Sequence, residues 1–161
     1  MGYVPGVTEG IIKQGNLVIR DRSMAKRLHA LRETYEWIDR NTPRDSMIQP
    51  NPASLDIAYG IYSNRASLAA DQFCGAAFGG SAAACANLLQ SLFPLFENGG
   101  VGPPQGPDYI CQRFPLKMII VKDTDPVWRN KSSWVWQSTP VHANAFSRVF
   151  ACPAPKLPAG L

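Results

Sequence analysis

The sequence predicts an α/β sandwich of two or three layers, with a small, mostly parallel sheet and a C-terminal strand pair. Three observations predict it. Helical and strand-like segments alternate along most of the chain, one apolar run marks a buried central strand, and proline- and glycine-rich turns separate the segments. The 161 residues suit a lead-in segment over 1–20, a single α/β domain over 21–152 and a disordered tail over 153–161.

The first clear element is a helix from about Ser23 to Arg40. Its apolar residues recur at steps of four and three, which puts them on one face: Met24, Leu28, Leu31, Tyr35 and Ile38. Asn41-Thr42-Pro43 ends this helix, because the residue before a proline is pushed out of the helical conformation. Met47-Ile48-Gln49 then reads as a short strand, closed by Pro50-Asn51-Pro52.

A second helix–strand unit follows this turn. Leu55, Ala58 and Tyr59 predict a short helix, with Asn51 or Ser54 as its cap. We expect residues 60–65 to turn the chain and residues 66–70 to form a strand of mostly small side chains.

Residues 72–96 contain no charge, so their length alone would permit a membrane span. Gln72, Asn87, Gln90, several glycines and a proline argue against one. A loop followed by an amphipathic helix that begins at Ser81 explains the pattern better, and Pro94 should kink or end that helix.

The strongest strand lies in the C-terminal half. Residues 116–121 include four consecutive apolar side chains, as expected of a central strand buried on both faces. A short helix or turn at 109–110 precedes it, and residues 123–128 form a turn with helix-start chemistry. Residues 134–137 and 146–150 are interpreted as the final hairpin or strand pair.

Charge and cysteine content exclude several function classes. The net charge is +4, but the densest basic run shares a helix with acidic residues, which indicates a solvated helix face and no nucleic-acid partner. The four cysteines show no CxxC spacing, so we do not expect a zinc site. We also predict no other metal and no cofactor. We expect the cysteines to be buried free thiols. One disulfide is the alternative if the domain lies in an oxidising compartment.

One family resemblance is carried by several stretches of this chain. Residues 36–43 (EWIDRNTP) and 45–48 (DSMI) resemble a helix–turn–strand that opens a Rossmann-like domain after the last membrane helix of bacterial multi-pass proteins. Those proteins are the glycosyltransferases of the GT-C architecture, of the dolichyl-phosphate-mannose-dependent type. Further similar stretches extend the resemblance over about residues 28–152: 59–65, 117–121, 125–128, 134–137, 140–141 and 146–150.

The resemblance implies an extracytoplasmic accessory domain on a bacterial membrane, periplasmic or at the cell surface. Its partners would be the membrane region of the same or a neighbouring protein and a carbohydrate, such as an acceptor glycan. The domain alone would not be catalytic, although the parent protein would be a glycosyltransferase. The acidic residues that handle substrate in such families lie in membrane loops, which this chain lacks. The alternative is a stand-alone small α/β ligand-binding module or enzyme.

Polar residues that follow two strands are the first candidate ligand contacts. Asp123 and Asp125 come after the predicted central strand, where α/β sheets commonly bind ligands, and Asn51 follows the first strand. These three residues would form one cleft, in which the carboxylates hold a metal or act as acid and base. The simpler interpretation is that Asp125 or Thr124 caps the turn that Pro126 begins.

Trp128 and Trp136 are the other candidate contacts. Three tryptophans between residues 128 and 136 exceed what a small core usually needs, and such rings can stack on sugars or anchor at a membrane interface. The competing interpretation places at least two of them in the core. His29 and His142 are interpreted as structural or surface residues, since the chain has no recognisable nucleophile motif.

Overall fold

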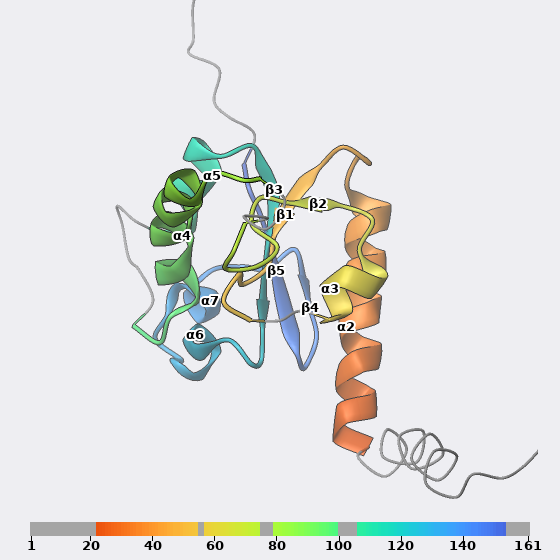
Figure 1. Ribbon diagram of the computed structural model, residues 1–161. Helices are drawn as coiled ribbons and strands as arrows, with labels where there is room; N and C mark the ends of the chain where they lie inside the picture. The colour runs from red at the N-terminus through yellow and green to blue at the C-terminus, as the bar shows by residue number, and fades with distance from the viewer. Residues whose placement is uncertain (1–21, 55–56, 75–78, 100–105, 154–161) are drawn as a thin grey trace, which may run out of the picture.

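The computed structural model describes residues 22–54, 57–74, 79–99 and 106–153, which form three layers with a sheet in the middle (Figure 1). The five strands lie in the order β2-β1-β3-β5-β4. Their bounds are β1 Met47–Gln49, β2 Ala66–Ser67, β3 Leu116–Lys122, β4 His142–Ala143 and β5 Ser147–Ala151. β1 pairs in parallel with β2 and β3, whereas β5 pairs antiparallel with β3 and β4. The predicted α/β sandwich with its C-terminal strand pair is confirmed.

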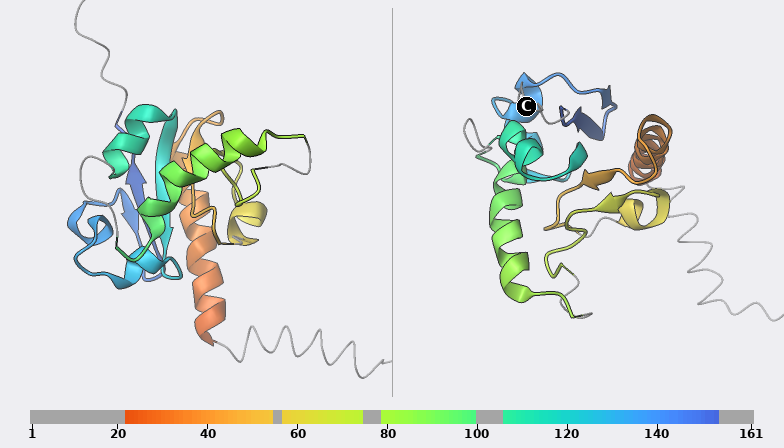
Figure 2. Two further views of the ribbon diagram at one scale, coloured as in Figure 1. Left: turned by 60° about the vertical axis from the view of Figure 1, so that its left-hand side comes forward. Right: turned by 90° about the horizontal axis from the view of Figure 1, so that it is seen from above.

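Helices cover both faces of this sheet (Figure 2). One face carries α2 (Arg22–Asn41) and α3 (Ile57–Tyr62). The other carries α4 (Ala82–Phe96), α5 (Pro107–Arg113), α6 (Pro126–Arg129) and α7 (Trp134–Gln137). β3 is buried on both sides, because Met118 and Ile120 pack against α2 while Ile119 and Val121 pack against the α4 layer.

The apolar stripe of α2 is buried as expected from Leu31 onward. Leu31, Tyr35 and Ile38 are almost completely inaccessible and pack on Ile48 of β1. Met24 is the exception, since it is 52% exposed. The first turns of α2 extend beyond the end of the sheet (Figure 1).

Several predicted boundaries are wrong. α3 continues through Gly60 to Tyr62, where a turn was expected. Pro94, expected to kink or end α4, does not end it. The helix continues to Phe96, because Leu92, Leu95 and Phe96 are buried together and their packing holds the last turn. Ser81 caps this helix as predicted, since its hydroxyl accepts a hydrogen bond from the Ala84 amide.

Residues 134–137 are helical and not part of the strand pair. The aromatic and β-branched residues there favour a strand by propensity, but Trp134 and Val135 are both buried in a single helical turn of α7. Tertiary packing therefore overrides strand propensity at this position. The second strand of the hairpin pairs instead with residues 142–143.

A side chain continues the pairing where β2 ends. β2 covers only Ala66–Ser67, shorter than the predicted 66–70. Beyond it, the buried Gln49 amide donates to the Ala69 carbonyl at 2.8 Å and accepts from the Ala69 amide at 2.9 Å. A side-chain amide thus satisfies the backbone groups that a longer strand would have paired.

All four cysteines form disulfides, so the expected free thiols are wrong. Cys74 pairs with Cys85 and ties the loop before α4 to that helix. Cys111 pairs with Cys152 and joins α5 to the chain after β5. The partners are 11 and 41 residues apart, and only the fold brings them together.

Four of the residues that carry the family resemblance form a hydrogen-bonded clasp between the end of α2 and the start of β2: Asp39, Thr42, Asn64 and Arg65. The Arg65 guanidinium donates to the Thr42 hydroxyl at 2.9 Å and to the Thr42 carbonyl at 2.8 Å. The Asn64 amide group donates to the Asp39 carboxylate at 2.7 Å. These contacts are structural and stabilise the fold.

Residues 1–21 and 154–161, with the predicted lead-in and tail, lie outside the described residues. Within the described ranges, no helix is both long and apolar enough to cross a membrane.

Candidate functional site

The connections from β1 and β3 run in opposite directions at the carboxyl ends of these neighbouring strands. β1 leads through α3 to β2 on one side, while β3 leads through α6 and α7 to β4 and β5 on the other. In an open α/β sheet, this divergence leaves a crevice outside the strand ends, where ligands commonly bind. The loops after β1 and β3 supply the side chains described next.

A buried hydrogen-bonded pair joins the two loops. Asn51 Nδ2 donates to Asp125 Oδ1 at 3.0 Å, and the Lys122 amide donates to Asp125 Oδ2 at 2.7 Å. Asp125 is completely buried and Asn51 is 4% exposed. Asn51 Oδ1 also accepts from the Ala53 amide at 2.9 Å, which shapes the Pro-Asn-Pro turn.

This geometry corrects the predicted role of Asp125 as a side-chain cap. Asp125 does occupy the N-cap position of α6, but its carboxylate makes no hydrogen bond to that helix. Its oxygens are used by Asn51 and by the backbone of Lys122 instead. The carboxylate therefore fixes one loop against the other.

Asp123 and Thr124 point elsewhere and meet Arg27 of α2. Arg27 Nε lies 2.8 Å from Asp123 Oδ1, and Arg27 Nη2 donates to the Thr124 hydroxyl at 3.1 Å. The structure thus brings Asn51 and Asp125 together but gives Asp123 a different partner. Among the described residues, no group of three His, Cys, Asp or Glu side chains could hold a metal ion.

Ser54 and Lys122 form a hydroxyl–amine contact at the wall of the crevice. Lys122 Nζ donates to Ser54 Oγ at 3.0 Å, and Ser54 Oγ donates its proton to the Asn51 carbonyl at 3.2 Å. The contact ties the end of β3 to the loop after β1, because Lys122 belongs to the strand and Ser54 to the loop.

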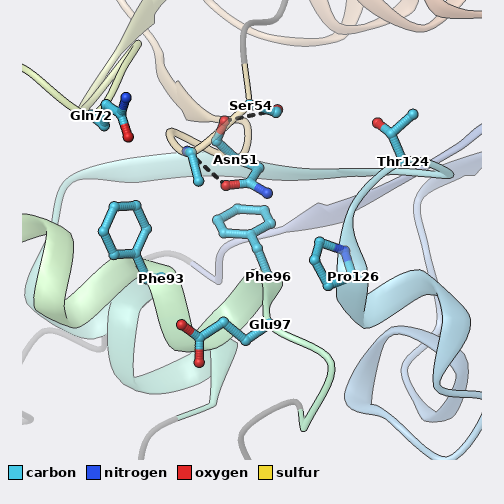
Figure 3. A pocket seen from close by; sticks show the side chains of 9 residues that line it. Asn51, Ser54, Gln72, Phe93, Phe96, Glu97, Thr124 and Pro126 are labelled. Carbon is cyan, nitrogen blue, oxygen red and sulfur yellow. Dashed lines mark hydrogen bonds between the residues drawn. The ribbon is translucent and has the colours of Figure 1, made fainter.

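A pocket of about 400 Å³ lies over these loops (Figure 3). Phe93, Phe96 and Glu97 of the α4 region form one side, and Asn51, Ser54 and Gln72 face them from the other. The remaining lining residues are Ala53, Thr124 and Pro126. The volume falls within the range of small-molecule sites in proteins.

Two polar groups of the pocket are placed to meet a ligand. Gln72 and Glu97 are exposed, whereas the exposed Thr124 hydroxyl already meets Arg27. Within the described part of the chain, neither the Gln72 amide nor the Glu97 carboxylate has a hydrogen-bond partner. The Phe93 ring is half-buried beside them, whereas Phe96 is core. The pocket therefore offers an apolar ring next to free hydrogen-bonding groups.

Sequence reasoning identified Asn51 but missed Gln72, Phe93 and Glu97. One signal was available, because Glu97 is the only charged residue between Asp71 and Asp108. A lone charge directly after an uncharged helix stands out in the sequence. Gln72 and Phe93 have no comparable signal, since only the packing of α4 on the sheet brings them together.

The predicted aromatic candidates are not among the lining residues of this pocket. Trp128 and Trp136 pack edge to face with ring centroids 5.0 Å apart, and Trp136 Nε1 donates to the Trp128 carbonyl. Lys131 and Arg148 both lie against the Trp136 ring. Trp134 is a core residue whose Nε1 donates to the Leu95 carbonyl at 3.0 Å.

The two histidines lie on the α2 side of the sheet. His29 is exposed on α2, 3.7 Å from the Glu33 carboxylate. His142 of β4 stacks on Trp37 with ring centroids 4.9 Å apart. Burial lowers the pKa of His142 below its ordinary value of 6.5, although Glu33 acts in the opposite direction.

No family model, no curated protein and no solved structure matches this chain.

Proposed function

We propose that this chain is an extracytoplasmic α/β accessory domain that binds a saccharide unit of a glycan in the pocket at the ends of β1 and β3. The observation that carries the proposal is the pairing of the half-buried Phe93 ring with the free Gln72 and Glu97 side chains in one pocket. The domain would position an acceptor glycan for a membrane-bound glycosyltransferase-like protein.

The chemistry of the pocket favours a neutral, hydroxyl-rich ligand. An aromatic face packs against the C–H surface of a sugar ring, while amide, carboxylate and hydroxyl groups bind its hydroxyls. Glu97 is the only charged side chain among the described lining residues. The Glu97 carboxylate repels phosphate, and the Lys122 amine behind this wall already contacts Ser54, so a nucleotide or sugar phosphate fits less well.

The disulfides support a place outside the cytoplasm. The described residues contain two disulfides, and disulfides persist mainly in oxidising compartments. The membrane-bound parent protein, the bacterial membrane face and the glycan partner rest on the resemblance described above. Genomic context tests that part: a stretch of membrane helices in the same reading frame or in a neighbouring gene would support it, and the absence of both would contradict it.

The pocket also supports the alternative of a stand-alone ligand-binding module. Residues of this chain line the pocket, as a ligand-binding module requires. The accessory domain and the stand-alone module differ in whether a membrane protein is attached or associated. A ligand-binding experiment on the pocket tests both.

A glycan-binding screen of the whole chain tests the proposal. We expect binding by the wild type and about tenfold weaker binding by Phe93→Ala, the loss that corresponds to one lost ring contact of about 1.4 kcal/mol. Glu97→Gln should weaken binding similarly. Phe73→Ala is the matched control, because Phe73 is 65% exposed and does not line the pocket.

Two results would contradict the proposal. One is no glycan binding by folded wild-type protein. The other is glycan binding that Phe93→Ala and Glu97→Gln leave unchanged. Circular dichroism of each variant shows that the protein is still folded.

A further inference from the structure

Asn98, in the turn after α4, differs from most other asparagines of the described ranges in how its side chain is used. Apart from Asn87, the other side-chain amides donate hydrogen bonds that hold them in place: Asn41, Asn51, Asn64, Asn130 and Asn144. The Asn98 side chain is exposed and has no hydrogen-bond partner among the described residues. Within this part of the chain, nothing fixes its amide group in one orientation.

The residue that follows Asn98 is a glycine, and no other asparagine in the sequence precedes one. Glycine has the widest range of backbone angles and no side chain to crowd its nitrogen. The space around Gly99 is open, since a Cβ added there would meet no atom beyond its chain neighbours within 4 Å. The Gly99 amide donates no hydrogen bond within the described residues. This backbone nitrogen can therefore approach the Asn98 side chain.

Asn87 shows that an exposed side chain is not sufficient for such an approach. Its side chain is also exposed and has no hydrogen-bond partner in the described ranges. However, Asn87 lies inside α4 and precedes Leu88, so the next backbone amide belongs to the hydrogen-bond pattern of the helix. The leucine side chain crowds that nitrogen as well. Asn98 combines a loose side chain with an unhindered neighbouring amide, and Asn87 does not.

We propose that Asn98 is a modification site at which the chain converts its own side-chain amide to a carboxylate. The Gly99 nitrogen gives up its proton and bonds to Asn98 Cγ, and the bond from Cγ to Nδ2 breaks as ammonia leaves. Water then opens the resulting succinimide ring by cleaving one of its two C–N bonds. The products are aspartate and isoaspartate at position 98, and the sum is one water consumed and one ammonia released with no change of oxidation state.

The new carboxylate would lie at the edge of the pocket. Glu97 lines the pocket and is the only charged residue between Asp71 and Asp108. A second negative charge at the next residue makes this edge repel anions more strongly. The Asn98 carbonyl also accepts a hydrogen bond from Asn130 Nδ2 at 2.9 Å, and in isoaspartate this carbonyl becomes part of the free carboxylate. The modification itself does not depend on glycan binding by the pocket.

Incubation of the whole folded chain, followed by peptide mapping with mass spectrometry, tests the site. We expect both aspartate and isoaspartate at position 98, formed faster at pH 8 than at pH 6 because the deprotonated Gly99 nitrogen is the nucleophile. In water enriched in heavy oxygen, each product should carry one labelled oxygen atom. Asn87 is the internal control and should stay unchanged while most of Asn98 converts.

Glycine substitutions provide the matched comparison. Gly99→Ala should slow conversion about tenfold, because the added methyl group hinders attack by its nitrogen. Gly60→Ala makes the same change in α3 and should leave the rate unchanged. An added Cβ meets no atom within 4 Å at either position, so both variants should fold, and circular dichroism checks this.

The proposal is overturned if the folded wild type shows no conversion at position 98, or if Asn87 converts as fast as Asn98. It is also overturned if Gly99→Ala converts at the wild-type rate, because attack by the Gly99 nitrogen would then not be the step that determines the rate.

Discussion

Asn51 Nδ2 donates a hydrogen bond to Asp125 Oδ1 across the crevice between the β1 and β3 loops, 74 residues apart in sequence. Both side chains are buried. The bond sets the distance between the two loops on which the pocket is built, and pocket shape therefore depends on a carboxylate that a ligand does not contact.

Removal of the Asp125 carboxylate should strongly destabilise the domain. Asp125→Ala leaves Asn51 and the Lys122 amide without their buried acceptor, and the free energy of unfolding should fall by about 3 kcal/mol. Urea denaturation measures this change. Asp123→Ala is the control and should cost less than about 1 kcal/mol, because its partner Arg27 is partly exposed. Equal losses for both variants would show that Asp125 does not fix the loops.

The two disulfides should make unequal contributions to stability. The Cys111–Cys152 bond closes the longer loop, 41 residues against 11 for Cys74–Cys85. Chain-entropy arguments give about 4 kcal/mol for Cys111→Ala/Cys152→Ala and about 3 kcal/mol for Cys74→Ala/Cys85→Ala. Chemical denaturation of both double variants measures the order.

The pairing itself can be checked before any variant is made. Alkylation and mass spectrometry of the unreduced, denatured protein should find no free thiol, and peptide mapping should recover the two linked pairs. Labelling of all four cysteines would contradict the pairing.

The hydrogen bonds of Arg65 in the clasp should contribute strongly to the free energy of unfolding. Arg65 is 9% exposed and donates to Thr42 and to the Asp39 carbonyl. Arg65→Met keeps the length of the side chain but leaves these acceptors unpaired, so we expect a loss of about 3 kcal/mol in the free energy of unfolding. Arg44→Met, at an exposed position, should change it little. A loss below about 1 kcal/mol for Arg65→Met would contradict the role of the clasp.

His142 should make stability depend on pH. Burial lowers its pKa in the folded protein below 6.5, so the unfolded chain takes up the proton first as pH falls. The contribution of the neutral ring is complete above pH 6.5 and is lost as pH falls from there through the lower, folded pKa. We expect the melting temperature to decrease over that interval.

Melting curves of His142→Phe between pH 8 and pH 5 test this prediction, because Phe keeps an aromatic ring on Trp37 but does not titrate. The variant should lose part of the decrease that the wild type shows. His29→Gln is the control, as His29 is exposed on α2. If the wild type and His142→Phe lose the same stability, the titrating group lies elsewhere.

Local patterns determined much of the fold. The apolar period of α2, the four-residue run in β3, the Ser81 cap and the proline-bounded β1 turn each follow from nearby residues, because each depends on backbone preference and on which side must be buried. Asn51 and Asp125 could be proposed as cleft residues for a related reason, since both follow parallel strands.

The tertiary structure decided what depends on distant partners. It made residues 134–137 a helix, carried α4 through Pro94, paired four cysteines that show no spacing signal and turned Asp125 from a cap into a link to Asn51. It also placed Phe93 beside Gln72 and brought Lys131 and Arg148 onto one indole. The sequence determines which segments need a buried face. The free energy of contacts between distant residues arises only when segments pack together, so packing decides which of the possible local structures forms.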